Sequence, residues 1–160
     1  NHMEGSGEDF KCVDPETNEK FIPYCIEPAL GLDRVILAFL CEAYDEEVLE
    51  SGDSREVMRF HPALAPYKVA VLPLNKKYHG EKAREVYSTL ASHFVTSYDE
   101  TASIGKRYRR CDAIGTPFAV TVDDDTLNNG TVTLRDRDTM EQIVLPLEEA
   151  VNYVEERIKF

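Results

Sequence analysis

Four cations stand close together in the chain, and their spacing gives them a possible binding function. On a helix at 100° per residue they fall within an arc of roughly 160°, and Ser103 is a suitable N-cap residue for that helix. Ile104, Tyr108 and Cys111 point the other way and can pack on a core. The cations are Lys106, Arg107, Arg109 and Arg110. The pattern predicts a helix face that binds phosphate or RNA backbone, with an alternative: a solvated face paired with nearby acids.

A second charged stretch follows further along the chain, with the sequence Arg135-Asp136-Arg137-Asp138. Alternate side chains of a strand share a face, so the two arginines lie together and the two aspartates lie opposite them. We therefore expect this strand end to be exposed. Arginine suits bidentate contacts with phosphate or guanine, and aspartate accepts from cytosine. The alternative, favoured on the pattern alone, is an intramolecular ladder of salt bridges.

Other residues that could do chemistry form no recognisable set. The three histidines His61, His79 and His93 stand alone and are expected to be surface or structural residues. The run 123–125 could hold a divalent cation, although a solvated turn is favoured. Cys12, Cys25, Cys41 and Cys111 form no C-x-x-C pair and are interpreted as free thiols of a cytosolic protein, so no metal site is predicted. No Walker loop or Rossmann fingerprint occurs.

The basic helix belongs to an alternation of strands and helices. We expect strands at 68–72, 95–98, 117–123, 131–135 and 142–145, and helices at 79–93, from Ser103, and from Pro146. Asn129-Gly130 is typical of a tight turn between antiparallel strands. The predicted fold class is α/β, a mixed five-stranded sheet packed by about three helices.

The N-terminal part reads differently. The opening Asn1-His2-Met3 is interpreted as a tag remnant, and residues 1–20 as a flexible leader with a turn at 14–17. A strand at 21–27 and a helix from Leu32 follow. That helix is apolar on nearly all sides between Val35 and Cys41, so something must bury it: either missing parts of a larger protein or the following domain.

Residues 42–56 hold seven acids and one base, a composition typical of a solvated surface or linker. The stretch 59–66 contains two prolines and is predicted to be a stiff connection, which places a domain boundary near residue 65. The whole chain of 160 residues has a formal net charge of −12, which argues against broad attraction to nucleic acid but not against a local basic patch. We see no membrane-spanning run and no signal peptide.

Several long strings resemble one known family. SIGKRYRRCDAIGTPFAVTVD, TVTLRDRDTMEQ, HPALAPYKVAVLPL and IEPALGLDR are similar to glycyl-tRNA synthetase of the dimeric class II type, in the family's order. The resemblance implies that 66–160 is an anticodon-binding domain, and that 21–65 is the end of the catalytic domain, with motif 3, followed by an acidic linker.

The resemblance also implies roles for single residues. Gly31 and Arg34 match the ATP-binding motif 3, whose arginine stacks on adenine, and Glu27 matches a glutamate that holds glycine. Ala29 stands where the family commonly has serine. Motifs 1 and 2 are absent, so no complete catalytic set is present. ATP and Mg²⁺ are implied for the cytoplasmic, homodimeric parent enzyme; this fragment is expected to bind neither, to be monomeric, and to be partly disordered over 4–44.

The function implied is binding of the anticodon stem-loop of glycine tRNA, whose anticodon ends in two cytosines. The four cations of 106–110 would contact backbone phosphate, and Arg135, Asp136 and Arg137 would position the loop or contact its bases. The alternative is a noncatalytic accessory or protein-interaction module of the same fold.

Overall fold

The computed structural model describes residues 2–49 and 52–160, and the chain forms two compact units. The first ends at Leu32 and the second runs from Asp33 to Phe160. Because the two are separate units, each is described by itself. The divisions that we expected at residues 20 and 65 concern the origin of the segments and stay predictions.

The first unit contains little regular structure. A short helix, α1 (His2–Ser6), precedes two antiparallel two-residue strands, β1 (Cys12–Val13) and β2 (Lys20–Phe21). The predicted turn between them is confirmed, since Asp14 Oδ1 accepts from the Glu16 amide at 2.8 Å. The predicted strand at 21–27 is wrong beyond Phe21, because residues 22–31 form no ladder with another strand.

The second unit begins with the predicted apolar helix, α2 (Leu32–Ala43). Its apolar side chains stay largely uncovered: Leu37 is 59% and Phe39 is 50% exposed. Part of this face lines an apolar groove of about 290 Å³ with Phe60, Leu64 and Pro66. Docking on the following domain therefore covers only a small part of the helix.

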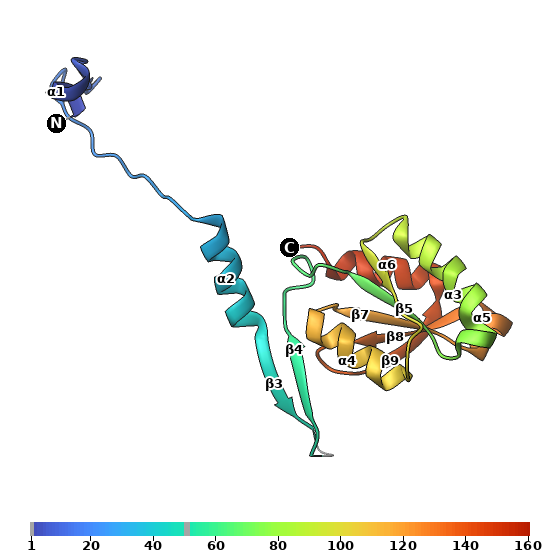
Figure 1. The fold of residues 1–160 in the computed structure, drawn as a ribbon. Coiled ribbons are helices and arrows are strands. Elements are labelled where there is room, and N and C mark those ends of the chain that lie inside the picture. The colour runs from blue at the N-terminus through green and yellow to red at the C-terminus, as the bar shows by residue number, and fades with distance from the viewer. Residues whose placement is uncertain (1, 50–51) are drawn as a thin grey trace. The chain divides into compact units, whose positions relative to one another are not determined.

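The expected acidic linker is instead a β-hairpin (Figure 1). Strand β3 (Tyr44–Val48) begins directly where α2 ends, and it pairs antiparallel with β4 (Ser54–Met58). The interpretation of 42–56 as a linker missed the alternation in β4, which buries Arg55 and Val57 and exposes the residues between. A period of two is the signature of a strand with one packed face.

The predicted mixed five-stranded sheet is confirmed. Its order is β6-β5-β7-β8-β9. Strand β5 pairs in parallel with both β6 and β7, whereas β8 pairs antiparallel with both β7 and β9. The strands are β5 (Val69–Pro73), β6 (Thr96–Tyr98), β7 (Phe118–Val122), β8 (Thr131–Asp136) and β9 (Gln142–Pro146). Short apolar runs predict the inner strands β5 and β7, because both are buried at every position and strands buried on both faces need no polar alternation.

Three longer helices cover the sheet, as predicted. Helices α3 (Lys76–Ala91) and α6 (Leu147–Arg157) pack on one face, where Val69, Val86 and Val154 belong to a single core. Helix α4 (Ile104–Ile114) packs on the other face, where Cys111 meets Ala70 and Ala119. Figure 1 shows α4 apart from α3 and α6. Of these three helices, only α4 packs on that face of the sheet.

The predicted tight turn at Asn129-Gly130 is wrong in its form. A six-residue helix, α5 (Asp124–Asn129), joins β7 to β8, and Gly130 is its left-handed C-cap with φ of 71°. Asp123 caps this helix through a capping box with Thr126, and Asp124 and Asp125 lie in its first turn, so the acidic run is the start of a helix and not the solvated turn that the sequence favoured. Among the described residues, no group of three or more His, Cys, Asp or Glu side chains could hold a metal ion.

A candidate nucleic-acid interface on helix α4

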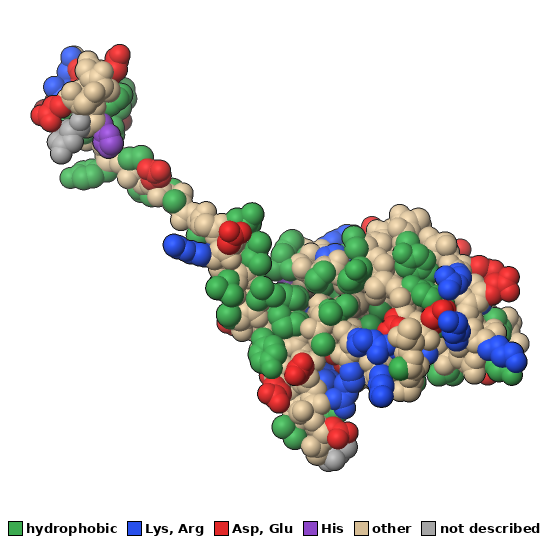
Figure 2. Space-filling model, viewed as in Figure 1, with side chains coloured by type: hydrophobic (Ala, Val, Ile, Leu, Met, Phe, Trp, Pro, Cys, Tyr) green, Lys and Arg blue, Asp and Glu red, His purple; other side chains and the backbone are tan. Residues whose placement is uncertain are grey.

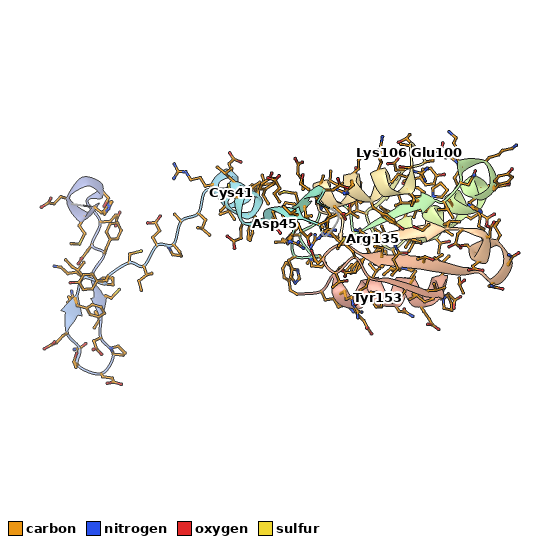
Figure 3. The ribbon with its side chains drawn as sticks, turned by 90° about the horizontal axis from the view of Figure 1, so that it is seen from below. Cys41, Asp45, Glu100, Lys106, Arg135 and Tyr153 are labelled. Atoms are coloured by element: carbon orange, nitrogen blue, oxygen red, sulfur yellow. The ribbon has the colours of Figure 1, made fainter. Side chains whose placement is uncertain are left out.

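Helix α4 begins where the sequence predicts, and its outer surface is basic. Ser103 has the extended backbone of an N-cap, although its side chain makes no capping hydrogen bond. Lys106 and Arg110 are exposed, and Arg109 is partly exposed. Figure 2 shows basic side chains gathering over α4, and Figure 3 shows Lys106 at the edge of the domain. These three cations are called the α4 cations below.

Arg107 does not join them, which corrects the expectation that this face presents four cations. Its side chain is 4% exposed, and it donates only to backbone carbonyls. Nε and Nη2 reach the oxygens of Thr101 and Ala102 at 3.1 and 2.7 Å, and Nη1 bonds to the oxygen of Pro73 at the end of β5. Arg107 therefore holds the loop before α4 onto the sheet, because its rigid planar donors match several carbonyls at once.

Arg110 braces the same loop from outside. Its guanidinium pairs with Asp99 and donates to the Thr101 oxygen at 2.8 Å. Burial raises the pKa of Asp99, but hydrogen bonds from Thr101 and Arg110 outweigh burial and hold that pKa below its ordinary value. Asp99 therefore stays charged at neutral pH, which leaves Arg110 only partly available to an RNA phosphate.

Arg109 faces the hairpin. It donates to the carbonyl of Ser54 at the start of β4, and its Nη2 lies 4.0 Å from Asp53 Oδ2. A shallow groove of about 300 Å³ runs between α4 and β4, lined by Ser54, Glu56, Arg109, Arg110 and Ala113. In the part of the chain that the structure describes, no hydrogen bond or ion pair joins the Lys106 ammonium to another residue. Lys106 and this groove form the most accessible part of the basic face of α4.

The strand end that carries Arg135 and Arg137 is not exposed, so that expectation is wrong. The two side chains are 6% and 2% exposed. Arg135 donates to Asp112 Oδ1 at 2.9 Å and lies over the Tyr108 ring at 4.7 Å. The favoured alternative, an internal network of salt bridges, is what the structure has. Figure 3 shows Arg135 inside the domain, between Lys106 and Tyr153.

Arg137 and Asp136 shape the turn after β8. Arg137 donates to the oxygens of Gly115 and Phe60, both at 2.9 Å, and pairs with Asp138 at 2.7 Å. Asp136 accepts from the amides of Asp138 and Thr139 at 2.8 and 3.0 Å. The arginine and Asp136 therefore fix the geometry of the turn.

Sequence reasoning missed Arg55, Arg59 and Asp112, which complete this network. Arg55 Nη1 lies 3.2 Å from Asp112 Oδ2, and Arg59 pairs with Asp45 and Asp138. The one signal in the sequence was that Arg55 is the single base in an acidic run of fifteen residues.

The residues that the resemblance assigns to ATP and glycine lie elsewhere in the chain. Glu27 and Gly31 are exposed in the irregular segment of the first unit, and Arg34 is exposed in the first turn of α2 in the second unit. Their roles remain predictions, and Ala29 adds no hydroxyl there.

The four cysteines differ in exposure. Cys12, Cys25 and Cys41 are exposed, and Cys111 is buried on the side of α4 that faces the sheet. Burial, followed by the charge of Asp112, raises the pKa of Cys111 to about 12. Since the thiolate is the reactive form, we expect an aromatic disulfide reagent at pH 8 to modify three thiols rapidly and the fourth only after unfolding. Rapid loss of all four thiols in the folded protein would contradict this, and Cys111→Ser should abolish only the slow phase.

The fold defines an α/β domain with one basic helix on its surface, and comparison with known proteins specifies the family. The model for the anticodon binding domain matches residues 68–157, so the chain belongs to that family. A solved structure, the RNA binding domain of threonyl-tRNA synthetase from Cryptosporidium parvum Iowa II, has a TM-score of 0.57 and 25% identity, covering 62% of this chain and 25% of that one.

Curated relatives carry one name. The proteins from Macrococcus caseolyticus (61% identical) and Geobacillus thermodenitrificans (62% identical) are both named glycine–tRNA ligase. Each match covers 159 residues, 99% of this chain, and so includes nearly all of the leader. The chain spans about a third of the length of these relatives, 34% in each case. No helix among the described residues is long and apolar enough to cross a membrane.

Proposed function

We propose that this chain is the C-terminal part of a glycine–tRNA ligase and that it binds the anticodon stem-loop of glycine tRNA. The observation that carries the proposal is the identity of about 60% over 159 residues to proteins named for that activity. The match of residues 68–157 to the anticodon binding domain supports the RNA-binding part of the proposal.

The α4 cations supply the contact to phosphate. Lys106 offers a point charge, and Arg109 and Arg110 border the groove beside β4. Glu56 lines the same groove and Asp53 lies beside Arg109, so both carboxylates repel RNA that does not place its phosphates on the cations. Arg107, Arg135, Asp136 and Arg137 act as positioning residues, since their polar groups already bond within the protein.

The activity of the whole protein would be activation of glycine with ATP and Mg²⁺, followed by transfer of glycine to tRNA. In it, Arg34 would stack on adenine as part of the ATP-binding motif that also contains Gly31, and Glu27 would hold the glycine ammonium group. This chain has no complete catalytic set, so we propose that it is inactive alone. We also propose that it is monomeric. The parent enzyme would be a cytoplasmic homodimer.

The experiment measures binding of this chain to the glycine anticodon stem-loop at several salt concentrations. A second stem-loop carries uridine in place of both anticodon cytosines. Tighter binding to the cytosine loop, weakening as salt rises, is the expected result. Equal binding to both loops would reduce the function to a general RNA surface, and absence of binding would favour the accessory module instead.

The α4 cations are tested by Lys106→Ala combined with Arg109→Ala. We expect affinity for the stem-loop to fall about tenfold, and the slope of log affinity against log salt to fall by about 1.4, from ~0.7 for each of two phosphate contacts. The control with matched charge is Lys77→Ala combined with Lys82→Ala on α3, where both lysines lie on the opposite face of the sheet from α4. Equal losses in the two double variants would rule out α4 as the specific contact.

A further inference from the structure

Arg55 reaches from the hairpin into the interior of the α/β sheet domain. Its side chain is 1% exposed although it belongs to a two-stranded hairpin. Nη1 donates to Asp112 Oδ2 on α4 at 3.2 Å and to the carbonyl of Arg137 after β8 at 3.1 Å. Nη2 lies 2.8 Å from Glu47 Oε2 on β3. One guanidinium thus joins the hairpin to a helix and to a strand end of the sheet domain.

Arg55 is part of a larger set of ion pairs in which the positive and negative charges are equal in number. The ion pairs link four arginines to four carboxylates across the hairpin, α4 and the end of β8. Burial raises the pKa of Asp138, but hydrogen bonds and charges from Arg137 and Arg59 outweigh it and keep that pKa below its ordinary value. We call this set the arginine network; its members are Asp45, Glu47, Arg55, Arg59, Asp112, Arg135, Arg137 and Asp138.

The hairpin is joined directly to the C-terminal end of α2. Helix α2 ends at Ala43 and β3 begins at Tyr44, without an intervening loop. The amide of Arg59, just after β4, donates to the Ala43 carbonyl at 2.6 Å. This hydrogen bond joins the last residue of α2 to the end of β4. Arg34 stands in the first turn of α2. Val57, fully buried beside Arg55, adds apolar packing to the same strand.

We propose that Arg55 is a positioning residue that fixes the hairpin, and through it the end of α2, onto α4 and β8, so that these elements move as one body. Arg109 of α4 bonds to the first residue of β4, so the surface proposed to contact RNA touches the hairpin directly. If the chain has the proposed function, RNA contact and the helix that carries Arg34 are mechanically joined through Arg55. The joining of the elements itself does not depend on RNA.

The test compares hydrogen exchange of hairpin amides with that of β5 and β7 in the same sample. In the unaltered protein we expect hairpin and sheet protection to agree within about tenfold. In Arg55→Met the hairpin should exchange about 100-fold faster by local opening, while β5 and β7 change by less than tenfold. Arg55→Lys, which keeps a charge near Asp112, should recover part of the hairpin protection.

Arg59→Met is the matched control, since Arg59 lies at the rim of the same network with its side chain 31% exposed. It should accelerate hairpin exchange less than Arg55→Met does. The proposal is overturned if Arg55→Met leaves hairpin exchange unchanged, or if protection falls equally in the hairpin and in β5 and β7, which would make Arg55 a general stabilising residue.

A second arm adds the glycine anticodon stem-loop. Bound RNA should slow hairpin exchange in the unaltered protein and not in Arg55→Met. If the stem-loop does not bind at all, the proposed function fails, and the exchange data without RNA still decide the role of Arg55.

Discussion

Replacing Asp112 with alanine should lower the free energy of unfolding of the second unit by about 3–5 kcal/mol. The Asp112 carboxylate is 1% exposed, and it is the charge that Arg55 and Arg135 share, at 3.2 and 2.9 Å. Its removal leaves two buried guanidinium groups facing each other without their common anion. Urea unfolding followed by circular dichroism at 222 nm measures the loss.

The control is Glu155→Ala, an exposed carboxylate on α6, which should change the free energy of unfolding by less than about 0.5 kcal/mol. A double variant sharpens the test. Adding Arg135→Met to Asp112→Ala removes one of the two orphaned cations, so the double variant should be less destabilised than the sum of the single variants. A loss below about 1 kcal/mol for Asp112→Ala would contradict the account of the arginine network.

Gly115→Ala should destabilise the protein by about 3 kcal/mol, for two separable reasons. Gly115 ends α4 with φ of 81°, a left-handed conformation that costs alanine about 1 kcal/mol. A Cβ at this position would also lie 2.6 Å from Phe60 Cδ2 and 2.8 Å from the Met58 carbonyl oxygen. Backbone at that distance must move, and overpacking of this kind costs about 2 kcal/mol more.

Gly130→Ala isolates the first reason. Gly130 ends α5 with φ of 71°, and a Cβ there would meet nothing within 4 Å. We therefore expect it to lose only about 1 kcal/mol. Thermal and urea unfolding of the two variants measure the difference, which reports the close approach of α4 to the end of β4. Equal losses would mean that the Met58–Phe60 backbone yields without cost.

The sheet could be predicted because its signals are local. Short apolar runs such as 69–73, buried on every position, and the stripe of α3 depend only on neighbouring residues. The hairpin could have been found in the same way, since Val57 and Arg55 alternate with exposed residues. The hairpin was not predicted because the acidic composition of 42–56 indicated a linker, and the two-residue period of burial in β4 was not recognised.

The burial and the hydrogen-bond partners of the arginines could not be predicted from helical periodicity. Helical periodicity gives the direction in which a side chain points, but not which hydrogen-bond acceptors lie in that direction. The acceptors of Arg107 are carbonyls at Pro73 and in the loop before α4, and the carboxylate that receives Arg55 lies 57 residues away in sequence. Lys106, Arg109 and Arg110 stay accessible only because no such partner covers them completely, a fact that tertiary packing decides.

The arginine network has a consequence for how this domain can be inherited. Asp45, Glu47, Arg55 and Arg59 precede the matched family region 68–157, and the other four members of the network lie inside it. Each half carries two positive and two negative charges that pair partly within that half, and the ion pairs Arg55–Asp112 and Arg59–Asp138 join the two halves. A genetic crossover between positions 59 and 68 would join halves with separate histories. Chimaeras between relatives should therefore be more stable when the crossover falls before residue 44 than when it falls between residues 59 and 68.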